Sequence, residues 1–182
     1  VAYLYIDSNV IQDIFRGRRP ESTYLLEHLR TKKAVACTSY FTLLELMNIG
    51  QESTFVWKCI KNGMTFDDML KHRYPRNLTS NDLEGVYKEV YEKFIERYVK
   101  PNIVKLYSLM PSGWDKAFEF MGDYNLSIGD AIHTATAIEA KCDILVTNDK
   151  DLISILTKNN LILSSIPSEL PSILEKNGFC QI

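Results

Sequence analysis

The stretch Ile144-Leu145-Val146-Thr147-Asn148-Asp149 is the clearest strand of the chain, and it ends in a polar turn. Its apolar and β-branched side chains are typical of a strand buried on both faces of a parallel sheet. We expect a helix directly after it, from Lys150 to about Leu156, because Asp149 is a residue type that caps helices. The pattern therefore predicts a strand that runs into a helix through Asp149.

The same change from strand to helix occurs elsewhere in the chain. Residues 3–6 form an apolar run that stops at Asp7, and the helix that follows is expected to end at Gly17. Further strands are expected at 34–38 and 161–163, and further helices start at Pro20, Ser39 and Ser127. This alternation predicts an α/β fold with a mainly parallel sheet and helices on both faces.

The segment from about residue 55 to 114 differs from the rest, with long amphipathic helical stretches and few strand signals. Asn81-Asp82-Leu83-Glu84 has the spacing of a helix start. No run of Gly, Ser or Pro resembling a linker borders the segment. We therefore expect one domain over residues 1–182, with a helical insertion at about 55–114.

Composition limits the function classes. The net charge of −2 and the pI of about 6.0 provide no general basic footprint for nucleic acid. The local group Arg16, Arg18 and Arg19 is more typical of solvated surface than of a binding face. No membrane-spanning run or signal sequence is recognisable, so we expect a soluble, cytoplasmic protein.

The cysteines argue against a zinc site. Cys37, Cys59, Cys142 and Cys180 lie far apart, without a CxxC pair or a His cluster. Cys37 and Cys142 lie in apolar runs, so buried free thiols in a reducing compartment are the better interpretation.

Four acidic residues could meet in one pocket. Asp7 and Asp149 each follow a strand, and ligands of parallel sheets bind at the carboxyl ends of strands. Asp130 lies in the first turn of its helix, and Glu45 lies about two turns into its own. Carboxylates this close repel one another unless a cation is present, and oxygen ligands suit Mg²⁺ or Mn²⁺. Such an ion would supply activated water for hydrolysis of a phosphodiester.

Each acid also has a purely structural interpretation. Asp130 completes a capping box with Ser127, Asp149 is a helix cap, and Asp7 is a turn residue. Glu45 is flanked by Leu43, Leu44, Leu46 and Met47, where an unpaired charge is unusual, but a solvent-facing helix edge explains it too.

Other polar and aromatic side chains near these acids invite the same question. A phosphate contact is open for His133, although a helix-surface or packing role is favoured. Core or dimer-interface packing is likewise favoured over base stacking for the aromatic series Tyr87, Tyr91, Phe94 and Tyr98.

Four blocks of the sequence resemble PIN-domain ribonucleases, and most closely the VapC-like toxins of toxin–antitoxin pairs. These blocks are Tyr5-Ile6-Asp7-Ser8-Asn9, Leu44-Glu45, the segment 129–137 (GDAIHTATA) and the segment 144–152 (ILVTNDKDL). The acid that opens an Ala-rich helix and the Thr-Asn-Asp turn after a strand are the specific part. The segment 55–114 is larger than the middle section of VapC-like toxins.

The resemblance implies a three-layer α/β/α sandwich and cleavage of RNA that depends on Mg²⁺ or Mn²⁺. It also implies a homodimer and, for a toxin, an antitoxin partner. Carried over position by position, the acidic ligands are Asp7, Glu45, Asp130 and Asp149. Supporting polar residues are Ser8, Asn9, Thr147, Asn148 and Asp151.

Alternative functions stay open at this point. One is a PIN-like nuclease of RNA processing or decay outside a toxin pair, and another is a non-catalytic module that binds RNA or protein. A phosphohydrolase of the haloacid dehalogenase type is disfavoured, because Asp7-Ser8-Asn9 stands where that class has Asp-x-Asp.

Overall fold

The computed structural model describes residues 2–32 and 35–179. Within these residues the strands are β1 (Leu4–Ile6), β2 (Ala36–Ser39), β3 (Val104–Tyr107), β4 (Ile144–Val146) and β5 (Leu163–Ser165). The helices are α1 (Ser8–Arg16), α2 (Pro20–Lys32), α3 (Tyr40–Lys61), α4 (Phe66–Lys71), α5 (Ser80–Val90), the π-helix η1 (Tyr91–Val99), α6 (Pro111–Tyr124), α7 (Ile128–Glu139), α8 (Lys150–Lys158) and α9 (Leu170–Lys176).

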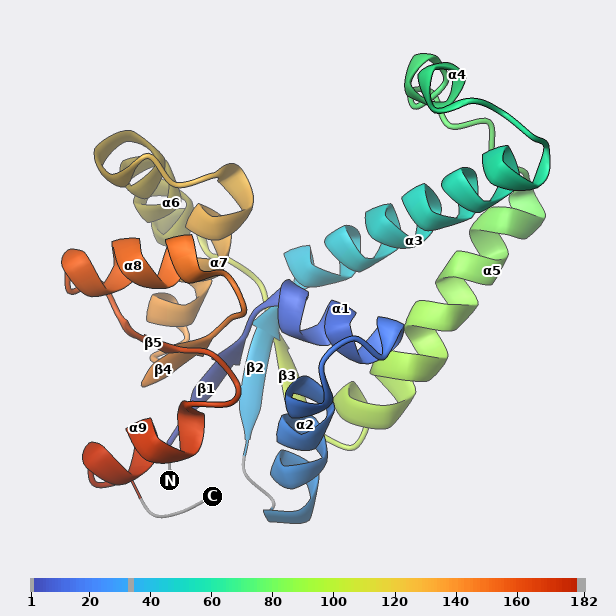
Figure 1. Ribbon diagram of the computed structural model, residues 1–182. Coiled ribbons are helices and arrows are strands. Elements are labelled where there is room, and N and C mark those ends of the chain that lie inside the picture. Colours follow the sequence, from blue (N-terminus) through green and yellow to red (C-terminus); the bar gives the residue numbers. More distant parts are fainter. Residues whose placement is uncertain (1, 33–34, 180–182) are drawn as a thin grey trace.

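The strands form one parallel sheet in the order β3-β2-β1-β4-β5 (Figure 1). The expected α/β class with a parallel sheet is confirmed. The strand order reverses at β1, since β2 and β3 extend the sheet on one side and β4 and β5 on the other. Ligands of open parallel sheets bind at such a reversal, outside the carboxyl ends of the strands.

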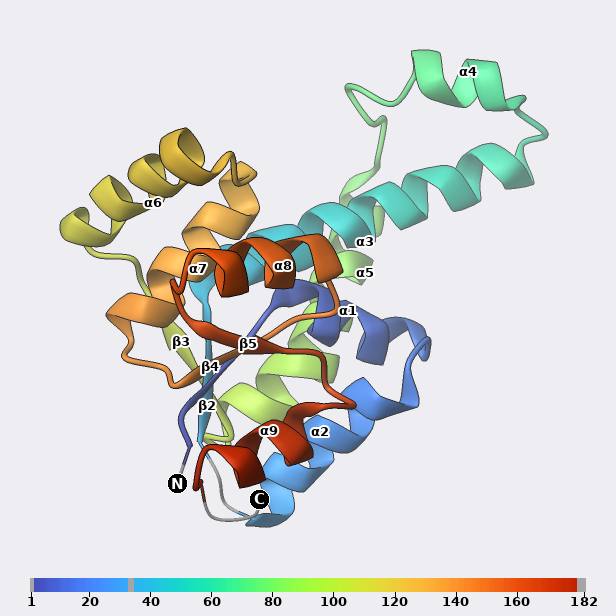
Figure 2. The same ribbon diagram turned by 60° about the vertical axis from the view of Figure 1, so that its left-hand side comes forward.

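Helices cover both faces of the sheet (Figure 2). Leu4 and Ile6 of β1 join a core cluster with α1, α2, η1 and α9. Tyr5 between them points to the opposite face and packs with α6, α7 and α8. Because successive side chains of a strand alternate between faces, β1 contributes to both cores. The three-layer arrangement expected from the family resemblance is therefore present.

Helices α3 and α5 run side by side away from the sheet, with α4 beyond their far ends (Figure 1). The two helices approach closely at Gly50, where an added Cβ would lie 2.5 Å from Cγ1 of Val86. An ion pair of 2.5 Å between Lys58 and Asp82 also joins them. Helix α5 begins at Ser80, slightly earlier than expected, because Thr79 and Asp82 form a complete capping box.

The segment expected to be a helical insertion at about 55–114 also contains a strand. Val104–Tyr107 forms β3, which extends the sheet beyond β2. Its burial falls from Val104 to the exposed Lys105, as is usual on an edge strand. A short strand that is buried on only part of its surface lacks the continuous apolar run that identifies β1 and β4.

Other sequence predictions can be placed on the structure. Residue 34, the first of the expected second strand, and Cys180 lie outside the described residues. Cys37 and Cys142 are buried free thiols, as expected, and Cys59 is buried and free as well. Among the described helices, none has the length and apolar character needed to cross a membrane.

The aromatic series of α5 and η1 divides between core and surface. Phe94 and Tyr98 are buried in the core, which confirms a packing role for these two. Tyr87 is exposed and stacks on Tyr91, with ring centroids 5.8 Å apart.

Candidate metal site at the strand ends

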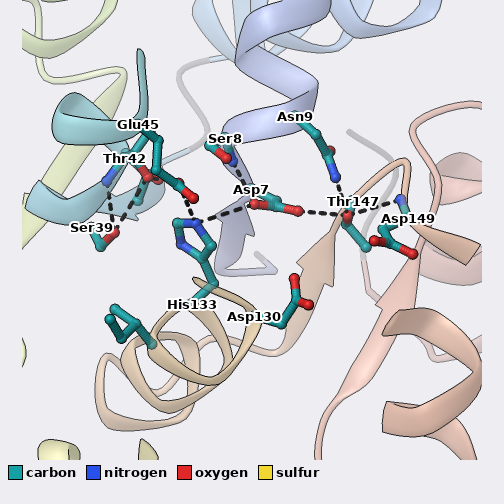
Figure 3. Close-up of polar contacts among 12 residues, drawn as sticks. Asp7, Ser8, Asn9, Ser39, Thr42, Glu45, Asp130, His133, Thr147 and Asp149 are labelled. Atoms are coloured by element: carbon teal, nitrogen blue, oxygen red, sulfur yellow. Dashed lines mark hydrogen bonds and ion pairs between the residues drawn. The ribbon is translucent and has the colours of Figure 1, made fainter. Parts of the chain in front are cut away.

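Asp7 occupies the centre of the polar cluster at the carboxyl ends of β1 and β4. It follows β1 directly and is the N-cap of α1, with 3% of its surface exposed. One carboxylate oxygen accepts a hydrogen bond from the Ser8 amide (2.6 Å) and the other from the Thr147 hydroxyl (2.6 Å) (Figure 3). Asp7 is therefore held rigidly, facing the gap between two neighbouring strands.

Thr147 connects the two strand ends. Its hydroxyl oxygen accepts from the side-chain amide of Asn9 (2.8 Å) and from the backbone amide of Asp149 (3.0 Å). The backbone amide of Asn148 donates in turn to the side-chain oxygen of Asn9 (3.0 Å). The parallel register pairs the last residues of β1 and β4, Ile6 and Val146, which places these polar residues opposite one another.

Asp149 caps helix α8, the structural role that the sequence also allowed. One of its carboxylate oxygens accepts from the amides of Asp151 (2.9 Å) and Leu152 (3.1 Å). Figure 3 shows the Asp149 carboxylate beside Thr147, on the same side of the strand ends as Asp7. Capping orients this carboxylate and leaves its second oxygen for another partner. The side chain of Asp151 lies at the exposed rim of the cluster instead.

Asp130 approaches from α7, opposite the strand ends. Ser127 caps this helix, and its hydroxyl donates to the Asp130 carboxylate (2.6 Å). Burial raises the pKa of Asp130, and the negative charges of Asp7 and Asp149 raise it further, against the opposing effects of Ser127 and His133. This repulsion shows that three of the four predicted acids share one electrostatic environment.

Glu45 reaches the cluster from α3 but points to a histidine. Its Oε2 lies 2.6 Å from Nε2 of His133, and that nitrogen is 3.5 Å from Oδ1 of Asp7 (Figure 3). The other carboxylate oxygen lies close to Gly129, where an added Cβ would be only 3.2 Å away. The solvent-facing helix edge considered for Glu45 is therefore wrong.

His133 is the residue that sequence reasoning undervalued. Its side chain is 2% exposed, and Nδ1 lies 2.7 Å from the hydroxyl of Tyr5. Burial acts to lower the pKa of His133, but the carboxylates of Asp7, Glu45 and Asp130 together raise it. Of the two roles favoured for His133, the helix-surface role is thus wrong and a packed interior position is confirmed, with both ring nitrogens in contact with neighbouring side chains. The spacing of three residues from Asp130 to His133 on one helix was the available signal.

Asp13 supports the site through Asn148, although the sequence analysis did not include Asp13 among the site residues. The side-chain amide of Asn148 donates to Asp13 (2.8 Å), which also pairs with Arg19 (3.3 Å). Asp13 and Ser22, a second neighbour of Asn148, are buried. Asp13 has no strand-end motif and is recognisable only in the folded chain.

A cavity of about 410 Å³ opens beside the cluster. It is lined by Asn9, Gln12, Asp13, Arg18, Arg19, Asn148, Asp149, Lys150 and Asp151. Arg18 and Arg19 are exposed, as the sequence predicted, and they line the same cavity as Asp149. Their positive charge is local, and it suits an anionic group bound close to the acids.

The donor set fits a hard divalent cation only in part. Asp7, Asp130 and Asp149 offer carboxylate oxygens, the ligands that Mg²⁺ and Mn²⁺ prefer. Within residues 2–32 and 35–179, however, no three His, Cys, Asp or Glu side chains already surround a common metal position. Mg²⁺ keeps several waters and needs only one or two carboxylates directly. The mutual repulsion around Asp130 is the feature that a cation would relieve.

Comparison with known proteins identifies the fold family. The family model described as PIN domain matches residues 4–156. The fold is similar to VapBC2 from Rickettsia felis bound to a DNA fragment from its promoter, with a TM-score of 0.56, 12% identity, and coverage of 90% of this chain and 98% of that one. No curated protein matches the chain in sequence.

Two further solved structures share the fold. A toxin–antitoxin complex from Klebsiella pneumoniae has a TM-score of 0.52 and 16% identity, covering 90% of this chain and 97% of that one. FitAcB from Neisseria gonorrhoeae has a TM-score of 0.52 and 12% identity, covering 91% and 98% respectively.

Proposed function

The chain belongs to the PIN-domain family, and from this premise we propose that it is a divalent-metal-dependent endoribonuclease that hydrolyses RNA phosphodiester bonds. The observation that carries the proposal is the meeting of Asp7, Asp130 and Asp149 at the reversal of strand order, where the charges of Asp7 and Asp149 help to raise the pKa of Asp130. Repulsion of this kind is common in active sites, although it lowers the stability of the fold, because a bound cation or substrate relieves it.

Asp7, Asp130 and Asp149 are the side chains that would hold Mg²⁺ or Mn²⁺. The ion would activate a water molecule and offset the charge that develops on the leaving oxygen. Thr147 and the Ser8 amide hold Asp7 in one orientation, and the capped helix α8 does the same for Asp149. Glu45, the fourth predicted ligand, contributes through its contact with His133.

RNA is proposed as the substrate because an anionic backbone fits the surroundings of the acids. Arg18, Arg19 and Lys150 line the adjacent cavity, where they can neutralise phosphates on either side of the cleaved bond. Asn9 and Asn148 offer amide groups at the same place. The basic side chains would attract the RNA backbone. The acids would repel the reacting phosphate unless a metal ion lies between them.

Cleavage of a labelled RNA with Mn²⁺ or Mg²⁺ tests the proposal. We expect Asp7→Asn to reduce the rate by at least about 100-fold, since it weakens the metal site. EDTA should abolish cleavage by the wild type. Asp123→Asn on the exposed surface of α6 is the matched control and should cleave normally. Cleavage that persists in both Asp7→Asn and EDTA would refute the proposed site.

A toxin role is the second part of the proposal, favoured because a solved structure of similar fold is a toxin–antitoxin complex from Klebsiella pneumoniae. An antitoxin would then be the partner, and the site of action would be the cytoplasm. Induced expression should arrest growth, whereas Asp7→Asn should not, and a small partner gene should lie beside this one. Cleavage without growth arrest would favour RNA processing or decay, and RNA binding without cleavage a non-catalytic module.

We also propose a homodimer of one PIN-like domain per chain. The paired helices α3 and α5 and the tip helix α4 expose large apolar side chains, among them Trp57, Ile60 and Phe66. Such exposure is typical of surfaces that become covered. Light scattering should give twice the chain mass of 21.0 kDa, and a mass of one chain would exclude the dimer.

A further inference from the structure

A buried chain of three side chains connects the core to the edge of the acidic cluster. The Tyr5 hydroxyl lies 2.7 Å from Nδ1 of His133, and Nε2 of His133 lies 2.6 Å from Oε2 of Glu45. Tyr5 is fully buried and His133 nearly so, whereas the Glu45 side chain is 26% exposed. The contacts therefore lead from the interior to the edge of the acidic cluster, and Figure 3 shows the part between His133 and Glu45.

The direction of these hydrogen bonds follows from chemistry. The Tyr5 hydroxyl is a phenol that can donate, and it lies within hydrogen-bond distance of Nδ1, so it donates to Nδ1 when the His133 ring is neutral. The ring proton of neutral His133 then lies on Nε2, which donates to Glu45. Nε2 also carries a proton in the imidazolium form. Donation to Glu45 is therefore the same in either charge state of the ring.

Glu45 would be poorly positioned without this donor. It is a long side chain with several rotamers, and its charge repels that of Asp7. His133 lies between the two carboxylates, 2.6 Å from Glu45 and 3.5 Å from Asp7. Gly129 leaves room for the second oxygen of Glu45, which a larger side chain would crowd.

We infer that Tyr5 and His133 are positioning residues that hold the Glu45 carboxylate beside Asp7 at the edge of the metal pocket. The inference rests on the proposed function and adds two residues to the site. Tyr5 acts from the sheet, without touching the acids or the substrate. Hydrogen-bond partners behind a metal site typically change metal affinity or activity by about 10- to 100-fold.

The decisive comparison is between two tyrosine variants. Tyr5→Phe removes the hydroxyl that orients His133, whereas Tyr3→Phe removes a hydroxyl that, among the described residues, hydrogen-bonds to Tyr107 (3.2 Å). We expect Tyr5→Phe to weaken Mn²⁺ binding, measured by electron paramagnetic resonance without RNA, by about 10-fold or more. For RNA cleavage kcat should fall while KM stays within about twofold, because the substrate contacts are intact. Tyr3→Phe should match the wild type in both measurements.

Two variants of His133 separate positioning from simple packing. The amide nitrogen of His133→Gln can occupy the place of Nε2, whereas that of His133→Asn lies nearer Nδ1. Mn²⁺ affinity should therefore be higher in His133→Gln than in His133→Asn. Thermal unfolding of each variant checks that the fold is retained.

The outcomes distinguish this inference from the proposed function. If the wild type neither binds Mn²⁺ nor cleaves RNA, the proposed function fails and the inference with it. If the wild type does both and Tyr5→Phe equals Tyr3→Phe in Mn²⁺ affinity and kcat, only the positioning role is overturned. Equal Mn²⁺ affinity in the two His133 variants would likewise contradict a donor role for Nε2.

Discussion

At the residue scale, the acids of the cluster differ in their surroundings. Asp7 is buried, and each of its carboxylate oxygens accepts a hydrogen bond of 2.6 Å. Asp130 has one hydroxyl partner and lies in the field of two other acids, so its pKa is raised. A metal ion would change the balance most at Asp130, and stability measurements can detect this without RNA.

Asp130→Asn should stabilise the metal-free protein. The pKa of Asp130 is higher in the folded chain than its ordinary value of 3.8, so the folded state binds this proton more tightly than the unfolded state. The fold therefore loses stability as pH rises from about 3.8 to the folded pKa of Asp130, and above that pKa the loss is complete. At pH 7 the melting temperature of Asp130→Asn should exceed that of the wild type, and near pH 3 the two should coincide. A lower melting temperature at pH 7 would contradict the repulsion.

Thr147→Val should impair both stability and cleavage. The change leaves an oxygen of the buried Asp7 without its donor, which costs about 1–3 kcal/mol in the free energy of unfolding. Cleavage should fall by about 10- to 100-fold, because Thr147 orients Asp7. Thr136→Val is the control, since in the described part of the chain that buried hydroxyl donates to the Ile132 carbonyl within its own helix α7. RNA cleavage should fall in Thr147→Val and stay unchanged in Thr136→Val. Denaturant unfolding measures the loss of stability in each variant.

At the scale of elements, the contact between α3 and α5 depends on a glycine. An added Cβ at Gly50 would meet Val86 at 2.5 Å, far inside van der Waals contact, whereas nothing lies within 4 Å of that position at Gly85. Both glycines are helical, so alanine improves the helix propensity equally at the two sites. The pair therefore isolates the effect of close packing between the helices.

Gly85→Ala should raise the free energy of unfolding by about 1 kcal/mol. Gly50→Ala should fall below Gly85→Ala by about 1–3 kcal/mol, because the stiff Val86 side chain resists overpacking. Urea titrations of both variants measure the difference. Equal stabilisation by the two substitutions would show that α3 and α5 separate easily.

At the scale of the whole molecule, β1, β4, α3 and α7 must all be in place before the four acids approach one another. An ion that binds only this folded arrangement stabilises it by mass action. The effect requires no knowledge of the RNA, and it tests the metal site independently of cleavage.

Mn²⁺ should raise the melting temperature. At 100 times its dissociation constant the ion adds about 2.7 kcal/mol of stability. For a chain of this size each kcal/mol corresponds to roughly 2–4 °C, so we expect a rise of roughly 5–11 °C. Asp7→Asn should show little of this shift. An equal rise in the two proteins, measured by calorimetry, would place the ion elsewhere.

Local patterns were sufficient for much of the architecture. Apolar runs that stop at Asp7 and Thr147 identified β1 and β4, and Ser39 and Ser127 identified the starts of α3 and α7. These signals are reliable because strand burial and helix capping act within a few neighbouring residues. The edge strand β3 was missed, since its burial depends on β2, which is distant in the chain.

The sequence by itself determined the α/β class and the acids at the strand ends. Only the tertiary structure decided how these acids are partnered. His133 and Glu45 are separated by 88 positions, and Tyr5 and His133 by 128. The packing of α3 and α7 against the sheet decides which face of each helix lies toward β1. It therefore also decides whether Glu45 contacts solvent or His133. Packing of this kind is a property of the whole core, because no local pattern specifies which distant surfaces meet.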